Sequence, residues 1–411
     1  MSATTKPQFV DASGRGQTSG FKVPYPARMY AYTEEEIAAV VNVLRGTRTL
    51  SQGEYQATFE NDFAAFVGTS HAYAVSSGSA ALKLTAQLCR LEPGDEVIIP
   101  AYTFCASAIP FGATGARIVW ADIDPSTRTI SAEDVANKIT PRTKVILAVH
   151  LLGMPCDMDR IMELARPHGI KVVEDCAQAP GATYKGRRVG SIGDFACFSF
   201  NSAKNLTTLG EGGMLVVNND QDAAAVTGLR HNGIRAYPAG RPRYWVPAMS
   251  NVDLDVEGQW PGKSCLTEAQ CALGSALLTR LDTISQTLRA QFESLRDMLK
   301  PLGCIKFQDV PSGRGFVAHC CIAGLEGAGV SRDEFMDVMT REYGIQLIVQ
   351  YRPLYQFPLF QKMGFGQADC PQLENYWSNS FSYPWWCGVP EETLDYLAEC
   401  TKKALEKSPK E

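Results

Sequence analysis

The segment from His71 to Val217 alternates short apolar runs with amphipathic stretches, and this alternation constrains the fold more than any other feature. The runs AYAVSS, GDEVIIPA, ARIVWADI, KVILAVH and IKVVEDCA have the length and apolar content of buried strands. Helical patterns such as GSAALKLTAQLCRL, SAEDVANKI and MDRIMELARPHG lie between several of them. The alternation predicts βαβ units and a mainly parallel sheet covered on both faces. Ligands of such sheets bind at the carboxyl ends of the strands, so the residues after each run are the candidate site.

The predicted domain boundaries follow from changes in this pattern. Residues 1–25 are polar and small, which predicts a flexible N-terminal arm. Residues 26–274 hold the alternating runs and predict one large α/β domain. The stretch SALLTRLDTISQTLRAQFESLRDMLK follows Gly274, ends at Pro301 and predicts a long helix into a second domain. Residues 275–411 mix strand and helix patterns, which predicts a small α+β C-terminal domain.

One helix near the N-terminus has both of its ends marked in the sequence. The stretch TEEEIAAVVNVLRG begins at Thr33, a preferred N-cap residue, and carries Glu36 at the position that completes a capping box. Gly46 follows the last periodic residue and predicts the end of the helix.

Composition excludes several classes of function. The formal net charge is −5 with 20% charged residues, and no clustered basic surface of the kind that binds nucleic acid is evident. The N-terminus lacks the apolar core of a signal peptide, and no window approaches the roughly 20 apolar residues of a membrane span. The 13 cysteines are scattered without a C-x-x-C pair, as buried thiols in a reducing cytosol are. A soluble, cytoplasmic protein with no nucleic-acid or membrane partner is expected.

Small residues and an aromatic follow two of the predicted strands. Ser77, Gly78, Ser79 and Ala80 open a helix, where converging backbone N–H groups and the helix dipole attract an anion. The same residues also fit a simple helix cap by Ser79. Phe104 stands beyond another strand end, where an aromatic ring can cover a planar ligand or belong to the core.

Two adjacent acids, Glu174 and Asp175, end the strand IKVV. Burying a carboxylate without a partner is unfavourable, so a cationic heterocycle or a metal ion is a natural counterpart. A metal requires further ligands, and no histidine-rich spacing accompanies these acids, so no metal is predicted. The alternative is that Asp175 caps a following turn.

Lys204 lies in FSFNSAKNLTTLGEGGMLVV, a glycine-rich loop between two predicted strands. A lysine in a pocket can carry protons or form a Schiff base, although most lysines simply lie at the surface. Taken together, an anion cradle, an aromatic cover, a carboxylate and a lysine are the groups needed to hold pyridoxal 5′-phosphate. The combination predicts a site for this cofactor at the strand ends.

From about Pro26 to the C-terminus, the chain resembles the DegT/DnrJ/EryC1/StrS family of sugar and cyclitol aminotransferases. The matching stretches are SSGSAALKL, GDEVIIPAYTFCASA, VHLLGMPCDMDRIMELARPHGIKVVEDCAQAPGATYKGRRVGSIGD and FSFNSAKNLTTLGEGGML, which agree in order, spacing and structural context. The resemblance implies the fold of the fold-type I PLP-dependent transferases, with a large mainly parallel α/β domain and a smaller α+β C-terminal domain. It also implies a homodimer with shared active sites.

The resemblance assigns a role to each matching position. Lys204 is implied to be the Schiff-base lysine and the carrier of the proton in catalysis. Asp175 is implied to pair with the pyridine nitrogen, and Gln178 to lie beside the phenolic oxygen of the cofactor. The phosphate is implied to be held by Gly78, Ser79 and Ser199, and the ring to be covered by Phe104.

The chain departs from the family pattern at three places. Asn201 stands where the family often has histidine, near the substrate. In PGKSCLTEAQCA, Lys263 replaces the asparagine that reaches the phosphate of the neighbouring subunit, and Cys265 replaces an arginine. Lys263 is expected to bind that phosphate as a point charge instead. From Lys204 to Glu211 the chain advances seven positions (211 − 204 = 7), where many members have six.

These features predict a PLP-dependent aminotransferase that moves an amino group from glutamate or glutamine to a keto group of a sugar or cyclitol. Such an enzyme belongs to the biosynthesis of amino sugars or natural products. Two alternatives stay open at this point: a dehydratase or aromatising amine synthase of the same family, and a non-catalytic regulatory homologue. A dinucleotide-dependent enzyme is disfavoured, because GEGGM is not a G-x-G-x-x-G motif and does not follow the first strand.

Overall fold

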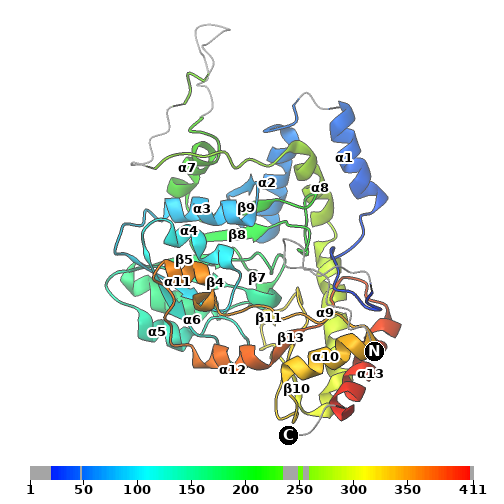
Figure 1. Ribbon diagram of the computed structural model, residues 1–411. Coiled ribbons are helices and arrows are strands. Elements are labelled where there is room, and N and C mark those ends of the chain that lie inside the picture. The colour runs from blue at the N-terminus through cyan, green and yellow to red at the C-terminus, as the bar shows by residue number, and fades with distance from the viewer. Residues whose placement is uncertain (1–19, 47–48, 235–248, 253–258, 408–411) are drawn as a thin grey trace.

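The computed structural model describes residues 20–46, 49–234, 249–252 and 259–407. Its centre is a seven-stranded sheet with the order β1-β9-β8-β5-β4-β2-β3 (Figure 1). Strand β9 runs antiparallel to both neighbours, and the other strands run parallel to one another. In chain order the strands are β1 (Ala72–Val75), β2 (Glu96–Pro100), β3 (Arg117–Ala121), β4 (Thr143–Val149), β5 (Lys171–Asp175), β8 (Phe195–Ser199) and β9 (Gly213–Val217).

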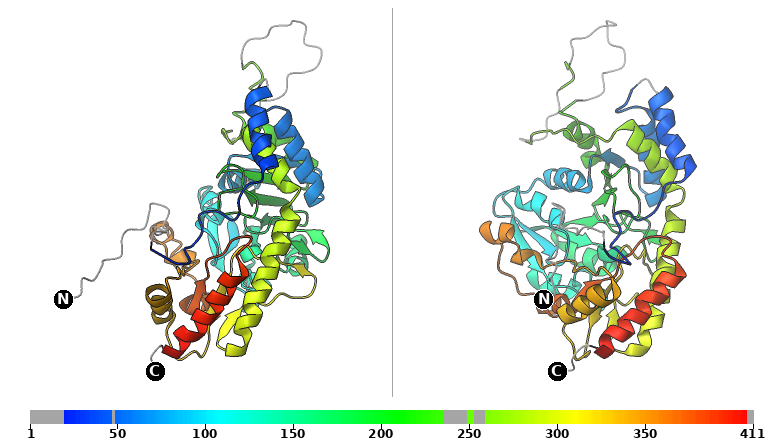
Figure 2. Two further views of the ribbon diagram at one scale, coloured as in Figure 1. Left: turned by 90° about the vertical axis from the view of Figure 1, so that its right-hand side faces the viewer. Right: turned by 45° about the vertical axis from the view of Figure 1, so that its right-hand side comes forward.

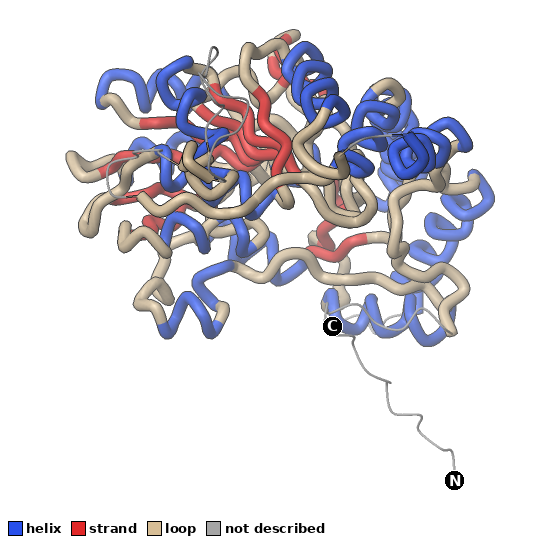
Figure 3. The backbone as a smooth tube through the Cα atoms, turned by 90° about the horizontal axis from the view of Figure 1, so that it is seen from above, coloured by secondary structure: helices blue, strands red, loops and turns tan. Residues whose placement is uncertain are grey.

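Both faces of this sheet are buried, as the apolar runs predicted. Successive residues of a strand point to opposite faces, so Ile146 and Val172 enter one core cluster while Val145 and Val173 enter another. Figure 3 shows helices on both sides of the strands. The expected α/β fold with a mainly parallel sheet is therefore confirmed.

The helices of this large lobe connect or flank its strands. Thr33 and Glu36 form the predicted capping box, because each backbone N–H bonds the other's side chain at 3.3 Å or less. The helices are α1 (Glu34–Gly46), α2 (Glu54–Val67), α3 (Gly78–Leu88), α4 (Ile109–Gly112), α5 (Ala132–Lys138), α6 (Met158–Ala165), α7 (Asp220–Arg230) and α8 (Glu268–Leu278).

A small lobe follows in the chain (Figure 2). Its three-stranded antiparallel sheet has the order β10-β12-β13, formed by β10 (Ile305–Phe307), β12 (Ile322–Leu325) and β13 (Ser380–Ser382). Its helices are α9 (Leu281–Leu299), α10 (Arg332–Tyr343) and α13 (Glu391–Lys407). A further small sheet, β11-β6-β7, pairs residues of the two lobes through β6 (Thr183–Tyr184), β7 (Arg187–Arg188) and β11 (Arg314–Gly315).

Gly274, after which the second domain was expected to begin, lies inside α8. A Cβ atom at this position would lie 2.5 Å from the Phe59 ring, so glycine allows α8 to pack closely against α2. The predicted single helix is two helices, since the chain breaks between α8 and α9 at Thr279 and Arg280. The side chain of Arg280 bonds Glu36, which ties this break to α1.

Part of the C-terminal region packs on the large lobe as well as on the small one. This segment carries α11 (Pro358–Lys362) and α12 (Pro371–Asn379). The indole N–H of Trp120 donates to the Phe365 carbonyl at 2.8 Å, and the buried Asp122 carboxylate accepts the first backbone N–H groups of α12. The chain therefore crosses between the lobes more often than its sequence pattern predicts.

The N-terminal segment that the structure describes, residues 20–32, also contacts both lobes. Val23 pairs with Ile345 of the small lobe, and the Tyr30 hydroxyl accepts a hydrogen bond from the Thr207 backbone N–H of the large lobe. The expected flexible arm falls outside the described residues up to position 19, whereas residues 20–25 are packed. Among the helices of the described chain, no helix is long and apolar enough to cross a membrane.

Candidate active site

A cavity of about 880 Å³ opens at the carboxyl ends of the parallel strands, between the two lobes. Residues from both lobes and from the N-terminal segment line it. Eight of the nine residues predicted for the cofactor and substrate are among its lining residues: Gly78, Ser79, Phe104, Asp175, Gln178, Ser199, Asn201 and Lys204. The fold therefore brings together side chains that are up to 126 positions apart in the sequence (204 − 78 = 126).

Lys204 lies in the loop between β8 and β9. Its backbone N–H donates to the Asn201 carbonyl at 2.9 Å, and the loop is closed by the bond from Phe200 N to Gly212 O at 2.8 Å. Gly212 has φ +156°, and a Cβ there would lie 2.0 Å from Thr208 Oγ1. The glycine is thus required by the packing of the loop itself, which presents Lys204 to the cavity.

Asp175 ends β5 and points into the cavity. Its Oδ2 accepts a hydrogen bond from the Ser107 hydroxyl at 2.7 Å, and its Oδ1 accepts from the Ala177 N–H at 3.1 Å. The residue is 4% exposed. Burial raises the pKa of this carboxyl, while the two hydrogen bonds and the positive charge of Lys204 act in the opposite direction. A cation placed against Asp175 would stabilise its charged form.

Glu174 occupies a different environment, because consecutive strand residues face opposite sides of the sheet. Its carboxylate accepts hydrogen bonds from His150 Nε2 at 3.0 Å and from the backbone N–H groups of Gly190, Ile192 and Gly193. Burial alone would raise its pKa, but the bonds from His150 and from this loop outweigh burial and lower the pKa.

His150, Glu174 and Cys176 lie close enough together to be considered as metal ligands. However, the backbone N–H of Cys156 donates to His150 Nδ1 at 3.0 Å and Nε2 bonds Glu174, so both ring nitrogens of His150 already have hydrogen-bond partners. Glu174 already accepts four N–H donors, which is the capacity of a carboxylate. These hydrogen bonds explain why the three side chains lie together, and the cluster supports the end of β5 beside the cavity.

Two hydrogen bonds fix the Gln178 side chain, one at each end of its amide group. Its Oε1 accepts from the Leu152 N–H at 2.6 Å, and its Nε2 donates to the Tyr351 hydroxyl at 2.9 Å. Because the oxygen is taken by Leu152, the amide presents N–H donors to the cavity. Such a donor suits a phenolic oxygen, the partner that the family resemblance implies.

The turn between β1 and α3 forms a cradle of backbone N–H groups. Ser77 caps α3 through a bond from Ala80 N to Ser77 Oγ at 3.1 Å, so Ser77, rather than Ser79, is the N-cap. The N–H groups of Gly78 and Ser79 belong to the first helical turn, which has no intrahelical acceptor for them. A Cβ at Gly78 would lie 2.8 Å from Ser199 Cβ, so glycine keeps this space open beside Ser199.

Phe104 and Asn201 line the cavity in contrasting ways. Phe104 is 55% exposed, and its ring meets the Tyr351 ring edge-to-face at 6.1 Å between centroids. Asn201 uses its polar atoms within its own loop: Nδ2 donates to the Gly210 carbonyl and to Glu211 Oε1, and Oδ1 accepts from the Ala203 N–H. Asn201 therefore positions the Glu211 carboxylate, which also lines the cavity.

Lys263 does not line this cavity. It is exposed, and its segment runs beside His231 in an isolated antiparallel bridge. Cys265, two residues later, pairs with Val75 at the end of β1, and its thiol donates to the Arg230 carbonyl at 3.6 Å.

Ser107, Tyr351 and His319 are among the cavity residues that were not predicted from the sequence. Ser107 orients Asp175 and lies in the AYTFCAS stretch, where its position three residues after Phe104 was the available signal. Tyr351 and His319 come from the small lobe, and no local pattern marks them. His319 Nδ1 bonds Asn205 Oδ1 at 2.9 Å, while burial and the charge of Lys204 hold the pKa of His319 well below its usual range.

The residues present fit pyridoxal 5′-phosphate. The glycine cradle accommodates a phosphate at a helix N-terminus, and the buried carboxylate of Asp175 calls for a cationic partner. Lys204 faces the same cavity with Gln178 and the exposed Phe104 ring. Each group that the cofactor requires therefore has a matching feature among the residues that line this cavity.

Comparison with known proteins gives consistent results. Residues 31–402 match the model of the DegT/DnrJ/EryC1/StrS aminotransferase family. The spore coat polysaccharide biosynthesis protein SpsC of Bacillus subtilis is 35% identical over 90% of this chain and 94% of its own length. The L-glutamine:2-deoxy-scyllo-inosose aminotransferase of Streptoalloteichus tenebrarius is 33% identical over 82% of this chain and 79% of its own length.

A solved structure matches nearly the whole fold. The putative sugar aminotransferase Spr1654 from Streptococcus pneumoniae, in its PMP form, superposes with a TM-score of 0.83 at 26% identity. The match covers 93% of this chain and 99% of that one. The chain therefore belongs to the DegT/DnrJ/EryC1/StrS aminotransferase family and is a pyridoxal-phosphate-dependent aminotransferase.

Proposed function

We propose that this aminotransferase moves an amino group from glutamate or glutamine to a keto group of a sugar or cyclitol. The observation that carries the proposal is the single cavity that contains Lys204, Asp175, Gln178 and the α3 cradle. The names of the similar proteins from Bacillus subtilis and Streptoalloteichus tenebrarius support an acceptor among polysaccharide precursors or cyclitols. We place the protein in amino-sugar or natural-product biosynthesis on the same ground.

The bound cofactor supplies an electron sink and a carbonyl that exchanges amino groups. Asp175, held by Ser107 and Ala177, would pair with the ring nitrogen. Gln178 would direct an N–H toward the phenolic oxygen, because Leu152 occupies its oxygen. Gly78, Ser79 and Ser199 would hold the phosphate and Phe104 would cover the ring face, since all four line the cavity.

Lys204 is the proton carrier of this proposal. Its side chain enters the cavity that also contains Asp175 and His319, and its charge affects the pKa of both residues. An amine at this position would take up and return the proton that transamination moves. Retention of lysine here favours transamination over the family's dehydratases, for which histidine at this position is expected.

The acceptor is tested with the pyridoxamine-phosphate form of the enzyme. This form is mixed with a nucleotide-linked keto sugar, a free keto sugar and a cyclitol ketone, and the return of the pyridoxal absorbance is followed. We expect one class to react much faster than the others. If glutamate or glutamine converts the cofactor to its pyridoxamine form but no ketone restores the pyridoxal form, the proposed amino donor is supported and the proposed acceptor class is wrong.

Asn201 is the position at which acceptor selection is tested. We expect Asn201→His to alter the preference among ketones, because the change releases Glu211 from its hydrogen bond as well as changing the cavity wall. Asn201→Gln is the matched variant that keeps an amide. Unchanged turnover and preference in both variants would contradict a role of Asn201 in acceptor choice.

The proposal includes a homodimer in which Lys263 serves the neighbouring active site. Lys263 is exposed and lies outside its own cavity, and Trp260 close by is 87% exposed. Mixing Lys204→Ala with Lys263→Ala subunits provides the test, because each hybrid dimer would contain one intact site. Activity in the mixture that neither parent shows is expected; a monomer in solution or no complementation would contradict shared sites.

A further inference from the structure

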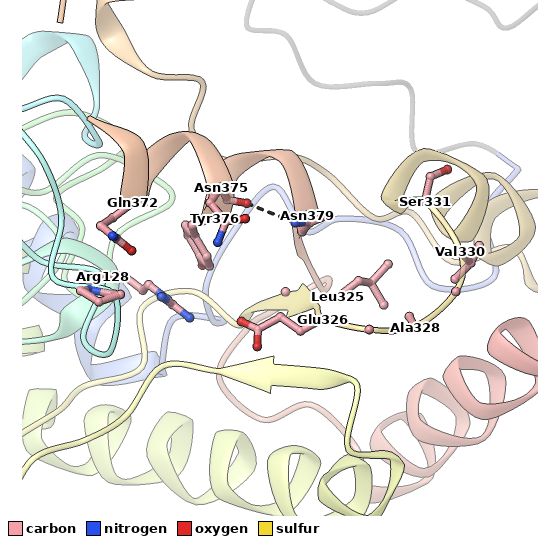
Figure 4. Close-up of a pocket in the computed structure, with 14 residues that line it drawn as sticks. Arg128, Leu325, Glu326, Ala328, Val330, Ser331, Gln372, Asn375, Tyr376 and Asn379 are labelled. Atoms are coloured by element: carbon pink, nitrogen blue, oxygen red, sulfur yellow. Dashed lines mark hydrogen bonds between the residues drawn. The ribbon is translucent and has the colours of Figure 1, made fainter. Parts of the chain in front are cut away.

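A second cavity, of about 610 Å³, lies at the junction of the two lobes (Figure 4). It is formed by the turn after β3 that carries Pro125 and Arg128, by residues 324–331 at the end of β12 and in the loop that follows, and by α12. None of its lining residues lines the catalytic cavity. The proposed reaction therefore gives this cavity no role.

Arg128 lines this second cavity from the large lobe. It has φ +64°, inside a turn closed by bonds from Arg128 N to Asp124 O and from Asp124 N to Thr129 O. The Asp124 carboxylate accepts the backbone N–H groups of Ser126 and Thr127, which fixes the turn. The guanidinium lies over the Tyr376 ring, 4.3 Å from its centroid, and the residue is 9% exposed.

This buried cation has no acidic partner. Among the described residues, Arg128 forms no salt bridge, its guanidinium contacts the Tyr376 side chain, and its Nε has no hydrogen-bond partner. A buried charge without a counter-ion is unfavourable. A guanidinium that faces a cavity is well suited to bind an oxyanion through two parallel hydrogen bonds.

Glu326 faces the same cavity from the small lobe (Figure 4). It is exposed, and its backbone N–H is anchored to the Cys304 carbonyl at 2.8 Å. The cavity is thus lined by a cation and a carboxylate that form no salt bridge with each other. A phosphate would be attracted by Arg128 and repelled by Glu326, whereas a zwitterion satisfies both charges.

Helix α12 adds amide groups to this pair of charges. Gln372, Asn375 and Asn379 line the cavity from successive turns of the helix, and Asn379 Nδ2 donates to the Asn375 carbonyl at 3.2 Å. Primary amides offer both donors and acceptors, so they suit a polar side chain. We propose that this cavity binds a free α-amino acid with a polar side chain, whose carboxylate pairs with Arg128 and whose ammonium pairs with Glu326.

Like the catalytic cavity, this second cavity is lined by residues of both lobes. Arg128 belongs to a turn of the large lobe, and Glu326 belongs to a loop of the small lobe. An amino acid that contacts both would stabilise the arrangement of the lobes seen here, because a ligand stabilises the state that it binds. The proposal does not depend on the identity of the amino donor or acceptor at the catalytic site.

Binding is tested by equilibrium dialysis and calorimetry on the full chain in its pyridoxamine-phosphate form. This form cannot react with amino donors at the catalytic site, although they could still bind there, which the variants distinguish. The probes are glutamine, glutamate, leucine, inorganic phosphate and glutaramic acid, the analogue of glutamine that lacks the ammonium group. We expect glutamine or glutamate to saturate the site and glutaramic acid to bind at least about tenfold more weakly.

Two variants and one control make the test specific. Arg128→Met should weaken binding at least about tenfold, and Glu326→Gln should abolish the preference for glutamine over glutaramic acid. Glu326 is exposed, so that variant serves even if Arg128→Met does not fold. Arg341→Met, at an arginine whose side chain is 77% exposed on α10, should leave binding unchanged.

Several results would overturn the proposal. The first is the absence of saturable uptake of every amino acid tested. The second is binding of phosphate alone, which would make the cavity an oxyanion site. The third is amino-acid binding that is equal in the wild type, Arg128→Met and Glu326→Gln, which would assign the uptake to another place, such as the catalytic cavity.

Discussion

The two acids that end β5 are neighbours in sequence but occupy opposite regions of the molecule. Asp175 faces the catalytic cavity, where two hydrogen bonds leave its pKa raised by burial. Glu174 belongs to the hydrogen-bonded cluster with His150, where four N–H donors lower its pKa. The difference shows that a fully bonded carboxylate serves the fold, whereas an incompletely bonded one is ready for a ligand.

The largest effect is expected on the cavity side, at Lys204. Lys204→Ala should lower turnover by roughly 10²–10⁴-fold, because the proton carrier is lost. The measurement is stopped-flow absorbance of the half-reaction with glutamate, together with the absorbance band of the lysine-bound cofactor, which should disappear. Lys185→Ala, at an exposed lysine paired with Asp159, is the control. A Lys204→Ala enzyme that turns over normally would remove Lys204 from the reaction.

The next largest effect is expected at Asp175. Asp175→Asn keeps the shape but removes the charge, and should lower turnover by roughly 10²-fold, as the loss of a fixed electrostatic partner does. Since the folded pKa is raised, the ionised carboxyl destabilises the cofactor-free protein above about pH 4. Asp175→Asn should therefore unfold at higher urea than the wild type at pH 7 without cofactor. If Asp175→Asn were instead less stable than the wild type and fully active, Asp175 would serve the fold and not the reaction.

Glu174 should show the opposite pattern. Glu174→Gln should lower the free energy of unfolding by about 1–3 kcal/mol at pH 7, because buried N–H donors lose a charged acceptor. The folded pKa is lowered, so the wild-type contribution is present above about pH 4.3 and is lost as the pH falls further. Urea unfolding at pH 7 and at pH 4 should therefore differ less in the variant than in the wild type.

Turnover provides the contrast for this variant. Glu174→Gln protein that remains folded should keep most of its activity, since Glu174 does not line the cavity. A loss of turnover comparable to that of Asp175→Asn, at full occupancy of cofactor, would show that the hydrogen-bonded cluster and the cavity are not separable.

The smallest effect is expected at the contact between the lobes. Tyr351→Phe removes the hydroxyl that accepts from Gln178 Nε2, which should weaken cofactor affinity by about 0.5–1.5 kcal/mol. Cofactor titration followed by absorbance measures the change. Tyr355→Phe, which removes a bond to Glu374 instead, is the matched control. Equal affinity in Tyr351→Phe and the wild type would mean that the small lobe does not orient Gln178.

Strong local patterns made the large lobe predictable. The apolar runs predicted the buried strands, and the Thr33–Glu36 capping box predicted the start of α1, because each depends on residues a few positions apart. The motifs around Ser77, Asp175 and Lys204 predicted strand-end positions, and these residues meet in one cavity. The roles assigned to them individually stay predictions.

Other features of the molecule depend on contacts that no local pattern records. Gly274 has the sequence appearance of a helix end but lies inside α8, since its neighbour Phe59 is more than 200 positions away (274 − 59 = 215). Likewise, the packing of α12 on the large lobe depends on Asp122. Distant partners of this kind decide boundaries that composition and periodicity leave open.

The sequence by itself determined the class of fold, the family and the chemical groups at the strand ends, because strand alternation and motif spacing are local properties. Only the tertiary structure decided what those groups do. It assigned Glu174 to the hydrogen-bonded cluster and Asp175 to the cavity, brought Tyr351 to Gln178, and placed Arg128 in one cavity with Glu326. The physical reason is that the charge state and bonding of a side chain depend on partners contributed by distant segments, which only folding brings together.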